Sequence, residues 1–162
     1  MKTVSSKQLY LMHAASHIPR PALVLGWLGV LPFVVFTSLA IAGALMPRAE
    51  AVGALVLYSI VIAGFMAGAQ WGLAVVVTHG DAAAIGSRLA ISVLPALAAF
   101  GSWYLPPRPA LLALAGIFCA LLMVDIAATR QGAAPAWYPA LRMQLTGAVV
   151  ACLLLAAWLG AR

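Results

Sequence analysis

Charged residues are scarce in this chain, which has 162 residues but only three acidic and nine basic ones. Charged side chains make up 7% of the sequence and apolar ones 65%, whereas soluble domains carry about 25% charged and about 45–50% apolar residues. A water-soluble fold could not bury so large an apolar fraction. The composition, with a mean hydropathy of +1.09, therefore excludes an ordinary soluble domain and indicates an integral membrane protein.

The sequence also lacks the residue patterns that carry familiar chemistry. It has no glycine-rich phosphate loop, nucleophile elbow, His-Glu-x-x-His sequence or paired carboxylates. His13 and His17 have the spacing of two metal ligands on one helix face, but no cysteine or carboxylate lies near them in the sequence. We therefore expect no metal site, no cofactor and no catalytic residue, and the sequence favours a protein that is not an enzyme.

Cysteine is sparse too, with Cys119 and Cys152 each near the middle of a separate apolar stretch. A disulfide requires Cβ atoms about 3.5–4.5 Å apart, whereas a free cysteine packs as a small apolar side chain. We expect both cysteines to serve in packing, with a disulfide or a metal or haem contact as the alternatives.

What the chain does have is a series of long uncharged stretches. A membrane-spanning helix needs about 20 apolar residues to cross about 30 Å of hydrocarbon, and short connections make successive helices antiparallel neighbours. The sequence thus predicts an all-α fold, in which residues 1–20 form an N-terminal cytoplasmic or interfacial segment and residues 21–162 a bundle of five transmembrane helices. The stretches run from Pro21 to Pro47, Ala51 to Thr78, Leu89 to Pro107, Pro109 to Val124 and Met143 to Ala161.

The basic residues are scattered singly, so the formal charge of +6 does not indicate a nucleic-acid partner. Cytoplasmic flanks of membrane proteins carry an excess of Lys and Arg. We therefore expect the N-terminus in the cytoplasm and the C-terminus outside. This orientation places six basic residues on the cytoplasmic side and three on the other, namely Lys2, Lys7, Arg20, Arg88, Arg130 and Arg142 against Arg48, Arg108 and Arg162.

Three glycines, Gly64, Gly68 and Gly72, are spaced by four in the second stretch and share one helix face. Glycines at this spacing let another backbone approach closely. We expect a helix to pack there, and we favour a helix of the same chain over a second copy of the protein.

Asp125 is the only acid expected inside a membrane-spanning helix. Such an acid costs about 2.5–3.5 kcal/mol at the bilayer centre, so we expect it to pair with Arg142, or alternatively with Arg130. Gln70 comes out at a similar depth, where it makes either an interhelical hydrogen bond or a ligand contact. We predict one cytoplasm-facing polar cavity, unless Asp125 merely locks a helix end. The cavity residues would be Gln70, Trp71, Arg88, Ser92, Asp125, Arg142 and Thr146.

Several short motifs follow one another along the chain. They are Ile18-Pro19-Arg20, Leu25-Gly26 with Gly29, Leu31-Pro32-Phe33, Gln70-Trp71-Gly72-Leu73, Ser92 to Pro95, and Trp137-Tyr138 with Leu141-Arg142. In these motifs the sequence resembles a family of small polytopic membrane proteins of unknown function found in bacteria and mitochondria. The resemblance implies a multi-span bundle in an inner membrane, which we expect to be the bacterial inner membrane, and it implies no activity.

Two classes of function remain. The small size, short loops and glycine stripe favour a non-catalytic accessory or assembly component of a membrane complex. Its partners would be the lipid bilayer and either another membrane protein or a second copy of the chain. Asp125, Gln70 and the mid-span prolines Pro32 and Pro95 favour instead a small-solute or proton carrier or channel. We expect the first class.

Overall fold

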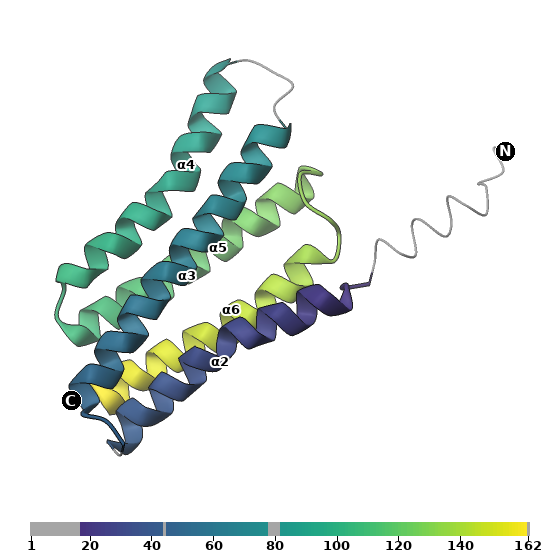
Figure 1. Cartoon of the computed structure of the whole chain (residues 1–162). Coiled ribbons are helices and arrows are strands. Elements are labelled where there is room, and N and C mark those ends of the chain that lie inside the picture. The colour runs from purple at the N-terminus through teal and green to yellow at the C-terminus, as the bar shows by residue number, and fades with distance from the viewer. Residues whose placement is uncertain (1–16, 44, 78–81, 162) are drawn as a thin grey trace, which may run out of the picture.

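The computed structural model describes residues 17–43, 45–77 and 82–161, and all regular secondary structure in these ranges is helical (Figure 1). Most of the predicted N-terminal segment therefore lies outside the described residues. The helices are α2 (Arg20–Ala42), α3 (Arg48–Val77), α4 (Ala82–Gly101), α5 (Pro107–Arg130) and α6 (Tyr138–Leu155). A 3-10 turn, η1 (Ser102–Tyr104), follows α4, and a π-helical turn, η2 (Ala156–Gly160), extends α6.

Proline and glycine set the ends of α2. Pro21 stands in its first turn, where the missing N–H has no partner to lose. At the other end Gly43 adopts a left-handed conformation, with φ 62°, and its N–H donates to the Leu39 carbonyl over 2.9 Å. Pro32 and Pro95 lie inside α2 and α4, as the sequence predicts.

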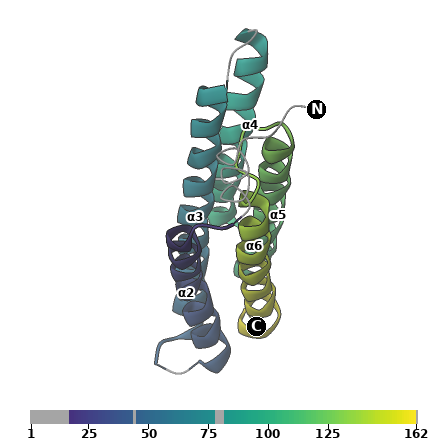
Figure 2. The ribbon, with the colours of Figure 1, turned by 90° about the vertical axis from the view of Figure 1, so that its right-hand side faces the viewer.

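Successive helices run antiparallel, so one end of the bundle holds the N-terminal ends of α2, α4 and α6 and the C-terminal ends of α3 and α5 (Figure 1). α2 packs between α3 and α6, while α5 packs on α3 and α6. α4 packs mainly on α3 at the edge of the bundle. Figure 2 shows that the α3–α4 pair extends beyond α2 and α6.

The apolar core lies between α2, α3, α5 and α6. At its centre the Phe33 ring meets the edges of Tyr58 and Phe118, with ring centroids 5.0 and 5.9 Å away. Phe33 and Phe118 are almost fully buried. Among the described residues of α4, Ala99 alone joins this core. The bundle is therefore held together by four helices, with α4 attached to its side.

Large apolar side chains also cover the outside of the bundle, including Leu25, Phe65 and Met123, each more than two-thirds exposed. An apolar outer surface is what lipid contact requires. Within the described ranges, four helices are long and apolar enough to cross a membrane, namely α2, α3, α5 and α6 with its η2 extension. This is the pattern of a multi-pass membrane protein.

The helix that carries the third apolar stretch is displaced from the prediction. It begins at Ala82, before the predicted Leu89, and α-helical geometry ends at Gly101, where the chain turns through η1 before the predicted end at Pro107. The all-α bundle of five helices is confirmed for the described residues. Membrane crossing by α4 stays a prediction.

No described residue packs closely against the glycine stripe of α3. A Cβ atom added to Gly64, Gly68 or Gly72 would have no heavy atom within 4 Å among the described residues. No described residue meets the expectation that another helix of the same chain packs there, and a packing role for these glycines stays a prediction. In this part of α3 the packed face is displaced by one residue, because Ala63 and Ala67 are buried there.

Two glycines outside the stripe are in close contact with another helical segment, Gly160 with backbone atoms and Gly26 with a side chain. A Cβ on Gly160 would lie 2.9 Å from the Ala40 Cβ and 3.4 Å from the Ala40 carbonyl carbon, so η2 contacts α2 through this glycine. A Cβ on Gly26 would lie 2.7 Å from the Leu145 Cδ1 atom. Both contacts join α2 to the last helical segment of the chain.

The two cysteines are both free. Cys152 is buried in α6, as expected of a packing residue, whereas Cys119 is exposed on α5. The disulfide considered from the sequence is absent.

Candidate functional site

A buried ion pair joins the last two helices. Asp125 lies near the C-terminal end of α5 and Arg142 in the second turn of α6, and the short antiparallel connection brings them together. The Arg142 Nε donates to the Asp125 Oδ2 over 2.5 Å. Asp125 is 2% exposed and Arg142 6%. Arg130 is exposed, so within the described ranges Asp125 pairs with the first of its two predicted partners.

The second carboxylate oxygen of Asp125 is also satisfied. The Gln70 Nε2 donates to Oδ1 over 3.0 Å, and the Tyr138 hydroxyl donates to the same atom over 3.4 Å. The Gln70 Nε2 also lies 3.2 Å from the Leu121 carbonyl. Gln70 therefore makes the interhelical hydrogen bond expected of it, from α3 to α5. Hydrogen bonds of this kind offset the loss of water around a buried carboxylate.

Three buried polar atoms of this network have no hydrogen-bond partner among the described residues. They are the Gln70 Oε1, the Arg142 Nη2 and the Thr146 Oγ1. Arg142 uses its Nη1 to contact the Met66 sulfur. A buried donor or acceptor left unpaired costs about 1–3 kcal/mol, so these atoms mark places where a further polar group would be favourable.

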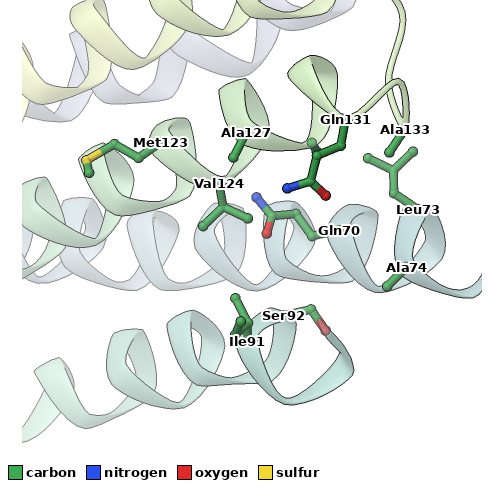
Figure 3. A pocket seen from close by; sticks show the side chains of 11 residues that line it. Gln70, Leu73, Ala74, Ile91, Ser92, Met123, Val124, Ala127, Gln131 and Ala133 are labelled. Carbon is green, nitrogen blue, oxygen red and sulfur yellow. The ribbon is translucent and has the colours of Figure 1, made fainter. Parts of the chain in front are cut away.

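A cavity of about 380 Å³ lies between α3, α4 and α5, and we call it the α4 cavity (Figure 3). Gln70, whose Oε1 is the first of the three unpaired atoms, lines this cavity. Gln70 projects from α3 toward α5 in this view. Ser92 lies on the α4 side, where its hydroxyl donates to the Leu89 carbonyl over 2.7 Å. The cavity wall includes Gln70, Leu73, Ile91, Ser92, Val124 and Gln131.

A smaller cavity of about 120 Å³ lies between α2, α3, α5 and α6, and we call it the α2 cavity. It is lined by the residues of the other two unpaired atoms, the Arg142 Nη2 and the Thr146 Oγ1. Arg142 and Thr146 are its polar side chains, and the rest of its wall is apolar or glycine. The wall includes Gly26, Val30, Phe33, Phe65, Phe118 and Leu145.

The residues predicted to line one polar cavity are thus divided. Gln70 and Ser92 line the α4 cavity, whereas Arg142 and Thr146 line the α2 cavity. Asp125 lines neither and is bonded to side chains of both groups. Trp71 is 44% exposed and lines neither cavity. The side chain of Arg88 and the whole of His13 lie outside the described part of the chain. A functional role for the seven predicted cavity residues stays a prediction.

Tyr138 is a member of the network that the sequence did not single out. It stands four residues before Arg142 on α6, so both side chains point to the same face. This spacing within the Trp137-Tyr138 and Leu141-Arg142 motif was the signal that could have identified it. Met66 carried no such signal, because a thioether in an apolar stretch reads as packing.

The apolar helices and the buried polar network define a multi-pass membrane protein with a helical-bundle fold. The sequence model of the family described as "Protein of unknown function (DUF3429)" matches residues 18–158. The chain belongs to this family, which is one of unknown function, as the resemblance implied. No curated protein and no solved structure matches the chain.

Proposed function

We propose that this protein is a non-catalytic accessory or assembly component of a membrane complex, placed in a bacterial inner membrane with its N-terminus in the cytoplasm. The observation that carries the proposal is the open glycine face of α3. Gly68 and Gly72 are exposed there, beside the exposed side chains of Val61 and Phe65. A groove floored by glycine lets a partner helix come close to the backbone.

The state of Asp125 supports a role without catalysis. Both of its carboxylate oxygens accept hydrogen bonds from protein side chains, Oδ2 from Arg142 and Oδ1 from Gln70 and Tyr138. These bonds use three of the roughly four acceptor sites that a carboxylate offers. An acid held in this way fastens α3, α5 and α6 together.

Purification in a mild detergent tests the proposal. We expect the wild-type protein to retain a stoichiometric partner helix, supplied by another protein or by a second copy, and Gly68→Leu to lose it. The matched control is Gly116→Leu, because Gly116 is exposed on α5 and also has no described heavy atom within 4 Å of an added Cβ. Equal retention by both variants would remove the glycine face as the docking site, and a lone monomer would contradict the component role.

A carrier is the second candidate, because the α4 cavity of about 380 Å³ has the buried residue Gln70 in its wall and the Gln70 Oε1 has no partner among the described residues. A protein that moves protons would acidify liposomes containing a pH-sensitive dye once the outside medium is made more acidic than the inside. Proton flux above that of empty vesicles, abolished by Gln70→Leu, would favour the carrier over the accessory component.

A further inference from the structure

We propose that the α2 cavity binds the uncharged carbonyl group of a lipophilic molecule that enters from the bilayer. Two buried donors define the site. Arg142 and Thr146 are 6% and 3% exposed, both line this cavity, and the Arg142 Nη2 and Thr146 Oγ1 have no partner among the described residues. The two residues are four apart on α6 and share one face. A single acceptor atom between them would satisfy both donors.

The charge of the site selects a neutral acceptor. Arg142 is already compensated by the Asp125 carboxylate, at 2.5 Å from its Nε. An anionic ligand would leave one uncompensated negative charge among apolar side chains, which is strongly unfavourable. A carbonyl oxygen accepts the same hydrogen bonds and brings no charge.

The walls and the size of the cavity select a lipophilic body. Phe33, Phe65 and Phe118 line it, and its volume of about 120 Å³ is far below the roughly 300–1,000 Å³ that encloses a drug-sized ligand. The cavity therefore holds only the polar part of a larger molecule. Leu25 and Phe65 line the cavity and are also 68% and 69% exposed, so it reaches the outer surface between α2 and α3.

The depth of the donors favours the acyl ester of a membrane lipid as the source of the carbonyl. Arg142 stands four residues after the start of α6, which is about 6 Å along the helix axis at about 1.5 Å per residue. It therefore lies near one edge of the span, and glycerolipids carry their ester groups at the boundary between headgroups and hydrocarbon. A lipophilic quinone offers the same chemistry at greater depth.

Native mass spectrometry of the full-length protein in detergent tests the site with a pair of probe lipids. The two phosphatidylglycerols share headgroup and chain length, but one has ester-linked and the other ether-linked chains, so only the first carries carbonyls. We expect the wild-type protein to retain the ester lipid several-fold more than the ether lipid. Equal retention of the two lipids, or retention of neither, would overturn the proposal.

Thr146→Val is the decisive variant, because it keeps the side-chain shape and removes a hydroxyl that has no described partner to lose. It should abolish the preference for the ester lipid while leaving the unfolding temperature unchanged. The matched control is Thr37→Val, whose buried hydroxyl donates to the Cys152 carbonyl over 3.3 Å and which does not line the cavity. This control should keep the preference. An unchanged preference in Thr146→Val would also overturn the proposal.

A competition experiment separates the two sources of the carbonyl. A quinone with a short isoprenoid tail is added to the wild-type protein loaded with the ester lipid, and to Thr146→Val. Displacement that depends on Thr146 assigns the carbonyl to a quinone. Retention of the lipid against excess quinone assigns it to the acyl ester.

Discussion

Tyr138 and Arg142 reach the two oxygens of one carboxylate from the same face of α6. The Tyr138 hydroxyl donates to the Asp125 Oδ1 over 3.4 Å, while the Arg142 Nε donates to Oδ2. Gln70 adds a bond from α3. The start of α6 is thereby fixed against the end of α5, close to the connection between them. The same cluster separates the α2 cavity from the α4 cavity.

We expect strong coupling between Asp125 and Arg142. Replacing either residue by Ala should destabilise the protein by about 3–5 kcal/mol, because the partner is left buried and unpaired. The double replacement should then cost clearly less than the sum of the two single ones. Thermal unfolding in detergent measures all four proteins.

The control is a second double-mutant cycle, in which Asp125→Ala is combined with Arg130→Ala in place of Arg142→Ala. Arg130 is exposed, so its effect should add to that of Asp125 within a few tenths of a kcal/mol. Additivity in the Arg142 cycle as well would mean that the ion pair contributes nothing to the stability of the bundle.

Tyr138→Phe should destabilise the bundle by a smaller amount, about 0.5–1.5 kcal/mol, which is the usual net value of one hydrogen bond. The loss is limited because Gln70 still donates to the same oxygen. Tyr104→Phe is the control, since Tyr104 is 75% exposed and its hydroxyl should contribute nothing measurable. A loss from Tyr138→Phe as large as that from Arg142→Ala would give the tyrosine a role that this geometry does not explain.

Gly160→Ala and Gly68→Ala should act in opposite directions. The new methyl group at position 160 would press on Ala40, including its backbone, and should cost about 1–3 kcal/mol. At position 68 nothing described lies within 4 Å, so alanine should stabilise the isolated chain by up to about 1 kcal/mol through its helix propensity. Chemical or thermal unfolding measures the stability of both variants. If Gly68→Ala destabilised the protein as much as Gly160→Ala, the glycine stripe would be an internal packing contact after all.

Topology depends on whether α4 crosses the membrane. With five spans and a cytoplasmic N-terminus, a reporter fused after Arg162 should be active only outside the cytoplasm, and a reporter between Thr78 and Asp81 should be active inside it. A C-terminal reporter that is active only in the cytoplasm would mean either that α4 does not cross or that the charge count gives the wrong orientation.

Much of this arrangement could be predicted from the sequence. The start of α2 follows from Pro21, whereas its end before Gly43 lies short of the predicted Pro47. The pairing of Asp125 with Arg142 follows from the cost of an isolated acid. The packing face of α3 could not be predicted, because Ala63 and Ala67 repeat at the same spacing as Gly64 and Gly68. Spacing alone does not say which of two adjacent faces turns inward.

The division of the polar residues into two cavities was also beyond the sequence. The sequence predicted Gln70, Ser92, Arg142 and Thr146 in one cavity, whereas they line two. Whether they share a cavity depends on what fills the space between them. Asp125, with its bonds to Gln70 and Arg142, occupies that space. Hydropathy and spacing carry no information about such side-chain geometry.

The attachment of α4 has a consequence for motion. Since Ala99 is its single described contribution to the apolar core, α4 is held mainly by its packing on α3, and a movement of α4 would leave the core of the other four helices packed. One wall of the α4 cavity, including Ile91 and Ser92, would move with it. Amide hydrogen exchange should therefore be faster in α4 than in α5. If α4 moves about a hinge beside η1, the α4 cavity becomes wider and narrower within the folded protein.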